Sequence, residues 1–186
     1  AVSGVLDYQV GQQHVTLEAG DSILVNGNML HRVKQVSGDR PDPIPIIIFS
    51  GAAVAPEYST IHEKYIQPIV QCNSLPFVVF RHACASHREL NGCIQDTYRR
   101  LREQSPCYEM AVQRNISRIF EYLFCHFDRL PKSEASRIQI KSQIRLQKML
   151  TYIYEHYAQA VTLQDIANAA HISRSEAGRC FTAYMG

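Results

Sequence analysis

The C-terminal part of the chain offers side chains whose chemistry suits recognition of nucleic acid. At helical spacing they would share one outward face, which carries Arg174, Ser175, Gly178, Arg179 and Thr182. An arginine can form two hydrogen bonds with a guanine edge, or it can bind a phosphate. We expect Arg179 to make the main base contact, whereas Gly178 offers no side chain. The alternative interpretation is a helical hairpin with a solvated arginine face.

Two capping patterns would position this face. Thr162 is a candidate N-cap with Asp165 three residues later, and Ser173 forms a capping box with Glu176. Residues 171–172 alone separate the two helices, so a tight turn would join them at a sharp angle. The N–H groups at both helix starts can bind phosphate, which makes Thr162 and Ser173 candidate DNA contacts.

The sequence around the turn has the spacing of two helices in contact. Ala167 is small where the helices approach most closely, and the other expected contact positions are Ile166, Ala170, Ile172, Ala177 and Cys180. A helix upstream would present one apolar face, formed by Leu146, Met149, Leu150, Ile153 and Tyr157. The turn position that is often glycine is His171. The pattern predicts a helix-turn-helix, whose second helix enters the major groove.

Composition places the chain among globular proteins, with 46% hydrophobic and 19% charged residues in 186. No apolar run approaches the roughly 20 residues of a bilayer span, and no signal peptide is visible. Residues 1–80 hold 4 Lys/Arg and 7 Asp/Glu (net −3), whereas residues 81–186 hold 15 and 10 (net +5). The basic half suits a polyanionic partner.

The six cysteines form no C-x-x-C pair, so we expect reduced, buried thiols in a cytoplasmic protein.

Hydrophobic periodicity divides the chain into three regions. Residues 2–49 alternate like short strands and end in a buried strand at residues 46–49, which suggests a barrel or sandwich. Two amphipathic helices follow, with Pro106 as the first residue of the second helix and its end before Pro131. Their apolar stripes are Leu90, Ile94, Tyr98 and Leu101, then Val112, Ile116, Ile119, Phe120, Leu123 and Phe127. These stripes fit either an ordinary core or a dimer interface, and the third region begins near Ser136.

Several of these segments together resemble a known family. Residues 149–157, 161–167 and 172–181, closed by Gly186, are similar to the first helix-turn-helix of the AraC/XylS transcription regulators. Residues 4–33, with Gly20-Asp21 and His31-Arg32-Val33, resemble the second half of a cupin barrel. The resemblance implies an effector-responsive and usually dimeric regulator. It also implies further barrel strands before Ala1 and a second helix-turn-helix beyond Gly186.

The resemblance implies the fold class and the domains as well. The expected class is α+β, with a partial cupin-type antiparallel β-barrel followed by an all-α helical hairpin and a helix-turn-helix domain. The boundaries are residues 1–80 for the effector-sensing barrel, 81–135 for a hairpin that dimerises or links, and 136–186 for the DNA-binding part. Family members generally present side chains to bases from the positions of Ser175, Gly178 and Arg179.

Strand alternation indicates which side chains would line the barrel. It places Tyr8, His31 and Gln35 inward and Arg32 and Lys34 outward. An apolar barrel with a few convergent polar groups suits a small molecule, so these three inward residues are candidate effector contacts. Satisfied core polar residues are the alternative. Metal-binding cupins use a His-x-His…Glu set and a later histidine, of which His31 alone matches, so we predict no metal, no cofactor and no catalysis.

The leading hypothesis is therefore an effector-responsive, sequence-specific, dimeric DNA-binding regulator in the cytoplasm. Its expected partners are a double-stranded promoter or operator, a small-molecule effector and a second copy of the chain. RNA polymerase is a further candidate partner, and no membrane is expected. One alternative is a metal-dependent cupin enzyme with an appended helical domain. The other is a helical protein–protein adaptor that never touches DNA.

Overall fold

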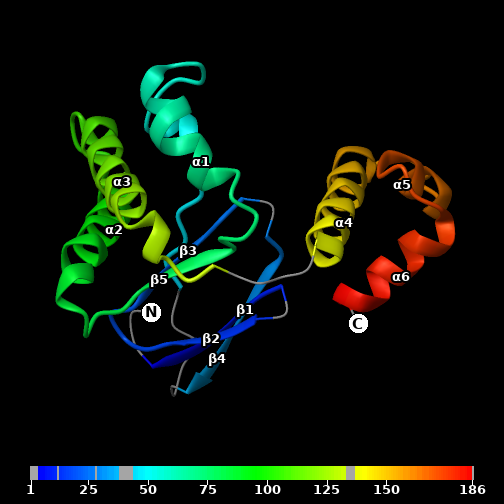
Figure 1. The fold of residues 1–186 in the computed structure, drawn as a ribbon, viewed down its shortest axis with the longest axis horizontal. Helices are drawn as coiled ribbons and strands as arrows, with labels where there is room; N and C mark the ends of the chain where they lie inside the picture. Colours follow the sequence, from blue (N-terminus) through cyan, green and yellow to red (C-terminus); the bar gives the residue numbers. More distant parts are fainter. Residues whose placement is uncertain (1–3, 12, 28, 38–43, 133–136, 186) are drawn as a thin grey trace. The chain divides into compact units, whose positions relative to one another are not determined.

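The computed structural model describes residues 4–11, 13–27, 29–37, 44–132 and 137–185. They form two compact units (Figure 1). Unit 1 holds two small antiparallel sheets and a helical hairpin, and unit 2 consists mainly of the helices after residue 134. The predicted α+β class is thus confirmed. None of the described helices has both the length and the low polarity that crossing a membrane requires.

Among the described residues of unit 1, five strands pair in two sheets. The first sheet has the order β2-β1-β4 and the second pairs β3 with β5, all antiparallel. Their bounds are Val5–Val10 for β1, Gln13–Leu17 for β2, Ser22–Val25 for β3, His31–Ser37 for β4 and Phe77–Phe80 for β5. Each strand is short, as the predicted turns require.

Strand β1 alternates as predicted. Leu6, Tyr8 and Val10 are buried, whereas the residues between them are partly exposed. In β4, Gln35 pairs with Leu6 and His31 with Val10, so both share the face of the buried β1 residues. His31 is nevertheless exposed, because it is the first residue of its strand.

Two predictions are wrong, one for a strand of unit 1 and one for the burial of the cysteines. Residues 46–49 form no strand, and Ile46 and Ile48 are 64% and 93% exposed. A run of apolar residues does not specify a paired strand, and within this run Phe49 does the packing, edge-on against Phe120 with ring centroids 6.2 Å apart. The cysteines are free, but no cysteine is buried, and Cys107 and Cys125 are exposed.

Two long helices form the hairpin of unit 1. They are α2 (Ala85–Glu103) and α3 (Tyr108–Cys125), and shorter helical segments span Gly51–Ala53, His62–Ile66, Gln67–Val70 (α1) and Phe127–Arg129. The first long helix ends where predicted, but α3 begins two residues after Pro106. The reason is the intervening backbone, since Cys107 has a φ of 64° and cannot lie in the helix.

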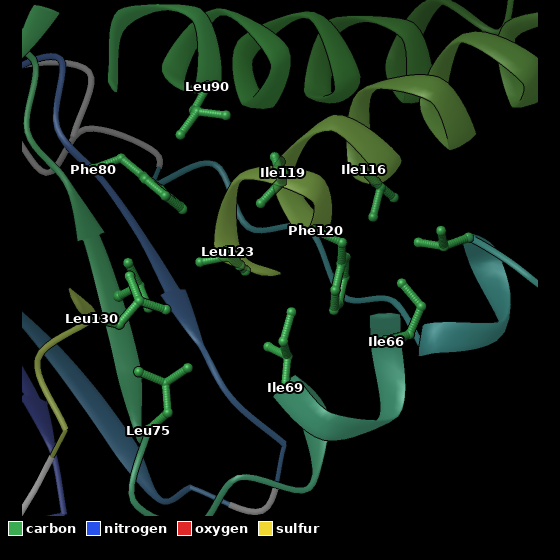
Figure 2. Close-up of a cluster of buried hydrophobic side chains, with 12 residues drawn as sticks. Ile66, Ile69, Leu75, Phe80, Leu90, Ile116, Ile119, Phe120, Leu123 and Leu130 are labelled. Carbon is green, nitrogen blue, oxygen red and sulfur yellow. The ribbon is translucent and has the colours of Figure 1, made fainter. Parts of the chain in front are cut away.

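The hairpin shares one hydrophobic core with the second sheet. Leu90 of α2 and the buried face of α3 pack with Phe80 of β5, and the labelled side chains converge in Figure 2. The fully or almost fully buried members include Ile66, Ile69, Leu75, Phe80, Ile116 and Leu123. Both predicted helical stripes therefore supply core residues, although Leu101 at the end of its stripe is 37% exposed.

A buried carboxylate fixes the turn before β3 to the end of β5. Asp21 is 5% exposed and accepts hydrogen bonds from Arg81 Nη1 at 2.7 Å, from the His82 backbone N–H at 2.7 Å and from the Glu18 backbone N–H at 3.1 Å. Burial alone would raise the pKa of this carboxyl. The hydrogen bonds outweigh it, so the pKa lies below its usual range and Asp21 stays ionised.

His87 connects the first turn of α2 to its neighbours. Its Nδ1 accepts a hydrogen bond from the Arg81 backbone N–H at 3.0 Å, and its Nε2 lies 3.0 Å from the Tyr122 hydroxyl of α3. A ring nitrogen that accepts carries no proton, so the neutral imidazole fits this place. Burial lowers the pKa of His87, while the charge of Asp21 opposes this shift and His126 adds to it.

This arrangement predicts a pH-dependent stability. The unfolded chain, with a histidine pKa of about 6.5, takes up a proton before folded His87 does. The contribution of His87 should be complete above that pH and be lost as the pH falls toward the folded pKa. Chemical denaturation between pH values of about 7.5 and 5 should show a flatter stability profile for His87→Gln than for the wild type. Parallel profiles for the two proteins would contradict this role.

Unit 2 contains three described helices: α4 (Arg137–His156), α5 (Leu163–Ala169) and α6 (Arg174–Met185). Leu146 and Met149 of α4 are fully buried, as predicted for its apolar face. Tyr157 was expected on the same face but is 78% exposed, because the helix ends at His156. The three helices enclose a small core of their own.

Candidate nucleic-acid interface

Helix α5 begins at the predicted N-cap. The Asp165 N–H donates to Thr162 Oγ1 at 3.2 Å, and the Thr162 N–H donates to Asp165 Oδ2 at 3.0 Å. This reciprocal capping box is confirmed, with aspartate in place of the more common glutamate. The hydrogen bonds from Thr162 lower the pKa of Asp165. Capping satisfies two N–H groups that the first turn of a helix leaves without partners.

The turn after α5 is a Schellman motif. The Ile172 N–H donates to the Ala167 carbonyl at 3.0 Å, and the His171 N–H donates to the Asn168 carbonyl at 3.0 Å. His171 takes a left-handed φ of 55°, at the position where glycine is usual. The turn is therefore as tight as predicted, and a histidine adopts the backbone conformation that glycine adopts most easily.

Replacing this histidine by glycine should stabilise unit 2. His171 is exposed, so His171→Gly removes little packing and relieves a left-handed backbone cost of about 1 kcal/mol. The control is Ala169→Gly, which places the same residue in helical backbone and should destabilise by about as much. Thermal unfolding of the three proteins checks both signs. A lower melting temperature for His171→Gly would contradict the argument.

The start of α6 is capped in the same manner. The Glu176 N–H donates to Ser173 Oγ at 3.2 Å, and Glu176 Oε2 accepts from the Ser173 N–H at 3.1 Å and from its hydroxyl at 2.8 Å. These bonds lower the pKa of Glu176. Arg145 Nη1 of α4 lies 3.7 Å from Glu176 Oε1, so the same carboxylate also links α6 to α4.

Small residues let the three helices of unit 2 approach closely. Ala167 of α5 and Ala177 of α6 are both fully buried, and both pack with Leu146 and Met149 of α4. The remaining predicted contact positions also join this core, namely Ile166, Ala170, Ile172 and Cys180. The capping boxes and this core together fix the angle between α5 and α6.

The predicted DNA-reading residues share one exposed face of α6. Arg174, Ser175, Arg179 and Thr182 are exposed, and Gly178 among them is partly exposed. Arg179 Nη1 lies 3.5 Å from Ser175 Oγ, one helical turn away, and the Thr182 hydroxyl donates to the Gly178 carbonyl at 3.1 Å. Thr162 lies apart from this face, at the start of α5.

Sequence reasoning missed the basic residues of α4. Arg145 contacts Glu176 at the start of α6, and exposed Lys141 and Lys148 flank it by about one helical turn. The sequence does carry a signal for them, because Lys141, Arg145 and Lys148 are spaced four and three residues apart, as on one face of a helix. It does not show which neighbouring helix that face contacts. Guanidinium and ammonium groups are side-chain groups that suit contacts with phosphate.

The three candidate effector residues share one sheet face. Tyr8 stacks on His31 with ring centroids 5.8 Å apart, and burial raises the pKa of the Tyr8 hydroxyl. Gln35 pairs with Leu6, two residue pairs away from the pair of Tyr8 with Val33.

A shallow depression of about 420 Å³ lies elsewhere in unit 1, and its lining includes Thr16, Asp21, Arg81 and His82. Within the described parts of the chain, no group of three or more His, Cys, Asp or Glu residues could hold a metal ion.

Comparison with known proteins adds one similarity. The chain is 22% identical over 180 residues to a protein of Bacillus subtilis (strain 168) named "Uncharacterized HTH-type transcriptional regulator YdeC". The similarity covers 97% of this chain but 60% of the length of that relative, so the chain spans less than two thirds of it. No protein-family model and no solved structure matches the chain.

Proposed function

We propose that this protein is a transcription regulator that binds double-stranded DNA in a sequence-specific manner. In this proposal α5 and α6 form a helix-turn-helix, and α6 enters the major groove. The observation that carries the proposal is the exposed polar face of α6, held by two capping boxes and a Schellman turn. The name of the B. subtilis relative supports the same function, as does the net positive charge of residues 81–186.

The exposed residues of α6 would divide the work of recognition. Arg179 would form two hydrogen bonds with a guanine edge, and Ser175 beside it would contact the same or the neighbouring base. Arg174 at the start of the helix would bind a phosphate together with the free N–H groups of the first turn. Ser173 and Thr162 would act mainly as caps, because their hydroxyl and N–H groups are already hydrogen-bonded. Thr182 would lie at the far edge of the contact.

Unit 1 would sense an effector and hold two copies of the chain together. We place a small molecule on the sheet face of Tyr8, His31 and Gln35, as in a cupin-type sensor of the AraC/XylS kind. Its binding would change the spacing of two DNA-binding units by favouring one arrangement of the dimer. In this view the protein acts in the cytoplasm by binding rather than by catalysis.

A thermal-shift screen of sugars and aromatic acids tests the proposed effector site. The screen is repeated on a Tyr8→Ala, His31→Ala double variant. Ligand-induced shifts in melting temperature that survive the substitutions would contradict this placement.

Salt-dependent binding tests the DNA-binding function itself. The intact protein should bind fluorescently labelled fragments of candidate promoters, and its affinity should fall as salt rises because phosphate contacts release counterions. Arg174→Gln should make the slope of the logarithm of affinity against the logarithm of salt concentration shallower by about one, because one phosphate contact is lost. Absence of binding to all fragments at low salt would contradict the proposal and would favour a protein–protein adaptor.

A further inference from the structure

Gly178 occupies a place in α6 that neither the helix nor its packing explains. It lies in the middle of Arg174–Met185, where glycine is the least favourable residue apart from proline. A helix tolerates this cost when the glycine meets a requirement that alanine cannot meet. Two such requirements are common inside proteins: a left-handed backbone and a neighbour too close for a Cβ atom.

Neither requirement applies at Gly178. Its backbone is helical, whereas Gly20 in the β2–β3 turn has a φ of +86°. Apart from its chain neighbours and the nearby backbone of α6 itself, a Cβ atom on Gly178 would meet no heavy atom of the described residues within 4 Å. At Gly20 and Gly51 the corresponding atom would lie 2.8 Å from His82 and Ile66. The space above Gly178 is therefore open among the described residues, and a binding partner could occupy it.

The surroundings of Gly178 indicate what would approach it. Ser175 and Arg179 flank it on the exposed surface, and Arg174 and Thr182 lie one turn before and after it. Gly178 is thus the centre of the face that carries hydrogen-bond donors for bases and phosphates. The Thr182 hydroxyl donates to the Gly178 carbonyl at 3.1 Å and so points back toward this centre. A duplex that contacted the residues around it would pass directly over Gly178.

We propose that Gly178 is the point of closest approach between α6 and DNA. Without a side chain, the backbone of α6 would lie against the base edges on the floor of the major groove. This seats Arg179 and Ser175 deeper than a helix with a Cβ atom at residue 178 would allow. The inference rests on the proposed DNA-binding function and changes the part that Gly178 plays in it. Its lack of a side chain is a requirement of the fit rather than a missing contact.

A substitution series with opposite effects on stability and binding tests this inference. Gly178→Ala and Gly178→Met should raise the melting temperature of unit 2, because both residues favour helix and the space is open. Both should weaken binding to a duplex enriched from a randomised library by the wild-type protein. We expect DNA affinity to fall about tenfold for alanine, which corresponds to about 1.4 kcal/mol of binding free energy. The fall should be larger for methionine.

A second glycine provides the matched control. Gly92 lies inside α2, is exposed, and would also accept a Cβ atom without contact. Gly92→Ala should raise the stability of unit 1 and leave DNA affinity unchanged. Wild-type affinity in both Gly178 variants, or tighter binding with methionine, would overturn the inference. If the wild-type protein enriches no duplex, the DNA-binding function itself fails, which is a distinct result.

Discussion

Arg179→Ala is expected to weaken binding of the intact protein to its preferred duplex by about 5- to 150-fold, or ~1–3 kcal/mol. Arg179 is exposed on α6, and its guanidinium lies 3.5 Å from Ser175 Oγ, so it is available to contact a base from the same face as Ser175. Losing two hydrogen bonds to one base should also relax the sequence preference at one base pair. Fluorescence anisotropy against the preferred duplex and its single-base variants measures both effects.

A control with the same charge change separates base recognition from general attraction. Arg114 is an exposed arginine of α3 in unit 1, so Arg114→Ala alters the net charge equally. It should leave both affinity and preference close to those of the wild type. Equal losses for the two variants would mean that Arg179 acts only through charge. An unchanged preference in Arg179→Ala would remove it from the base-reading set.

Leu146→Ala is expected to destabilise unit 2 by about 2–5 kcal/mol. Leu146 is fully buried in the core of unit 2, and three of the four other buried members of that core are alanines, whose short side chains cannot extend into the cavity. Because this core sets the angle of α6, the variant should also lose DNA affinity at temperatures where unit 2 melts. Calorimetry should show a lower transition for unit 2 and an unchanged one for unit 1.

The matched control lies on the same helix. Ile144 is 39% exposed, so Ile144→Ala removes apolar side-chain volume without leaving a closed cavity. Its cost should be well below that of Leu146→Ala. Similar destabilisation by both substitutions, or a shift of the unit 1 transition, would contradict the description of unit 2 as a separate core.

The sequence predicted most of unit 2 because the rules that shape it are local. The capping boxes of Thr162 and Ser173 depend on residues three positions away, and the Schellman turn depends on six consecutive residues. The alanine spacing likewise predicted which residues would be buried between α5 and α6. The exposed face of α6 followed from helical periodicity alone, so every candidate residue on it could be placed from the sequence.

Features that depend on distant neighbours could not be predicted in this way. The contact of Arg145 with Glu176 joins two helices about thirty residues apart, and the hydrogen bond of His87 with Tyr122 joins α2 to α3. The exposure of Ile46 and Ile48 depends on whether a partner strand lies beside them. A run of apolar residues alone does not predict such a partner. His31 shares the predicted sheet face, but strand alternation does not report exposure at a strand end.

Enrichment from a randomised duplex library tests whether α6 recognises a DNA sequence. The intact protein and the Arg174→Ala, Arg179→Ala double variant would each select DNA over several rounds at moderate salt. We expect the wild type to enrich a defined sequence containing at least one strongly preferred guanine, and the double variant to enrich none. A wild-type pool as random as the starting library, or the same enriched sequence with both proteins, would contradict a DNA-reading role for α6.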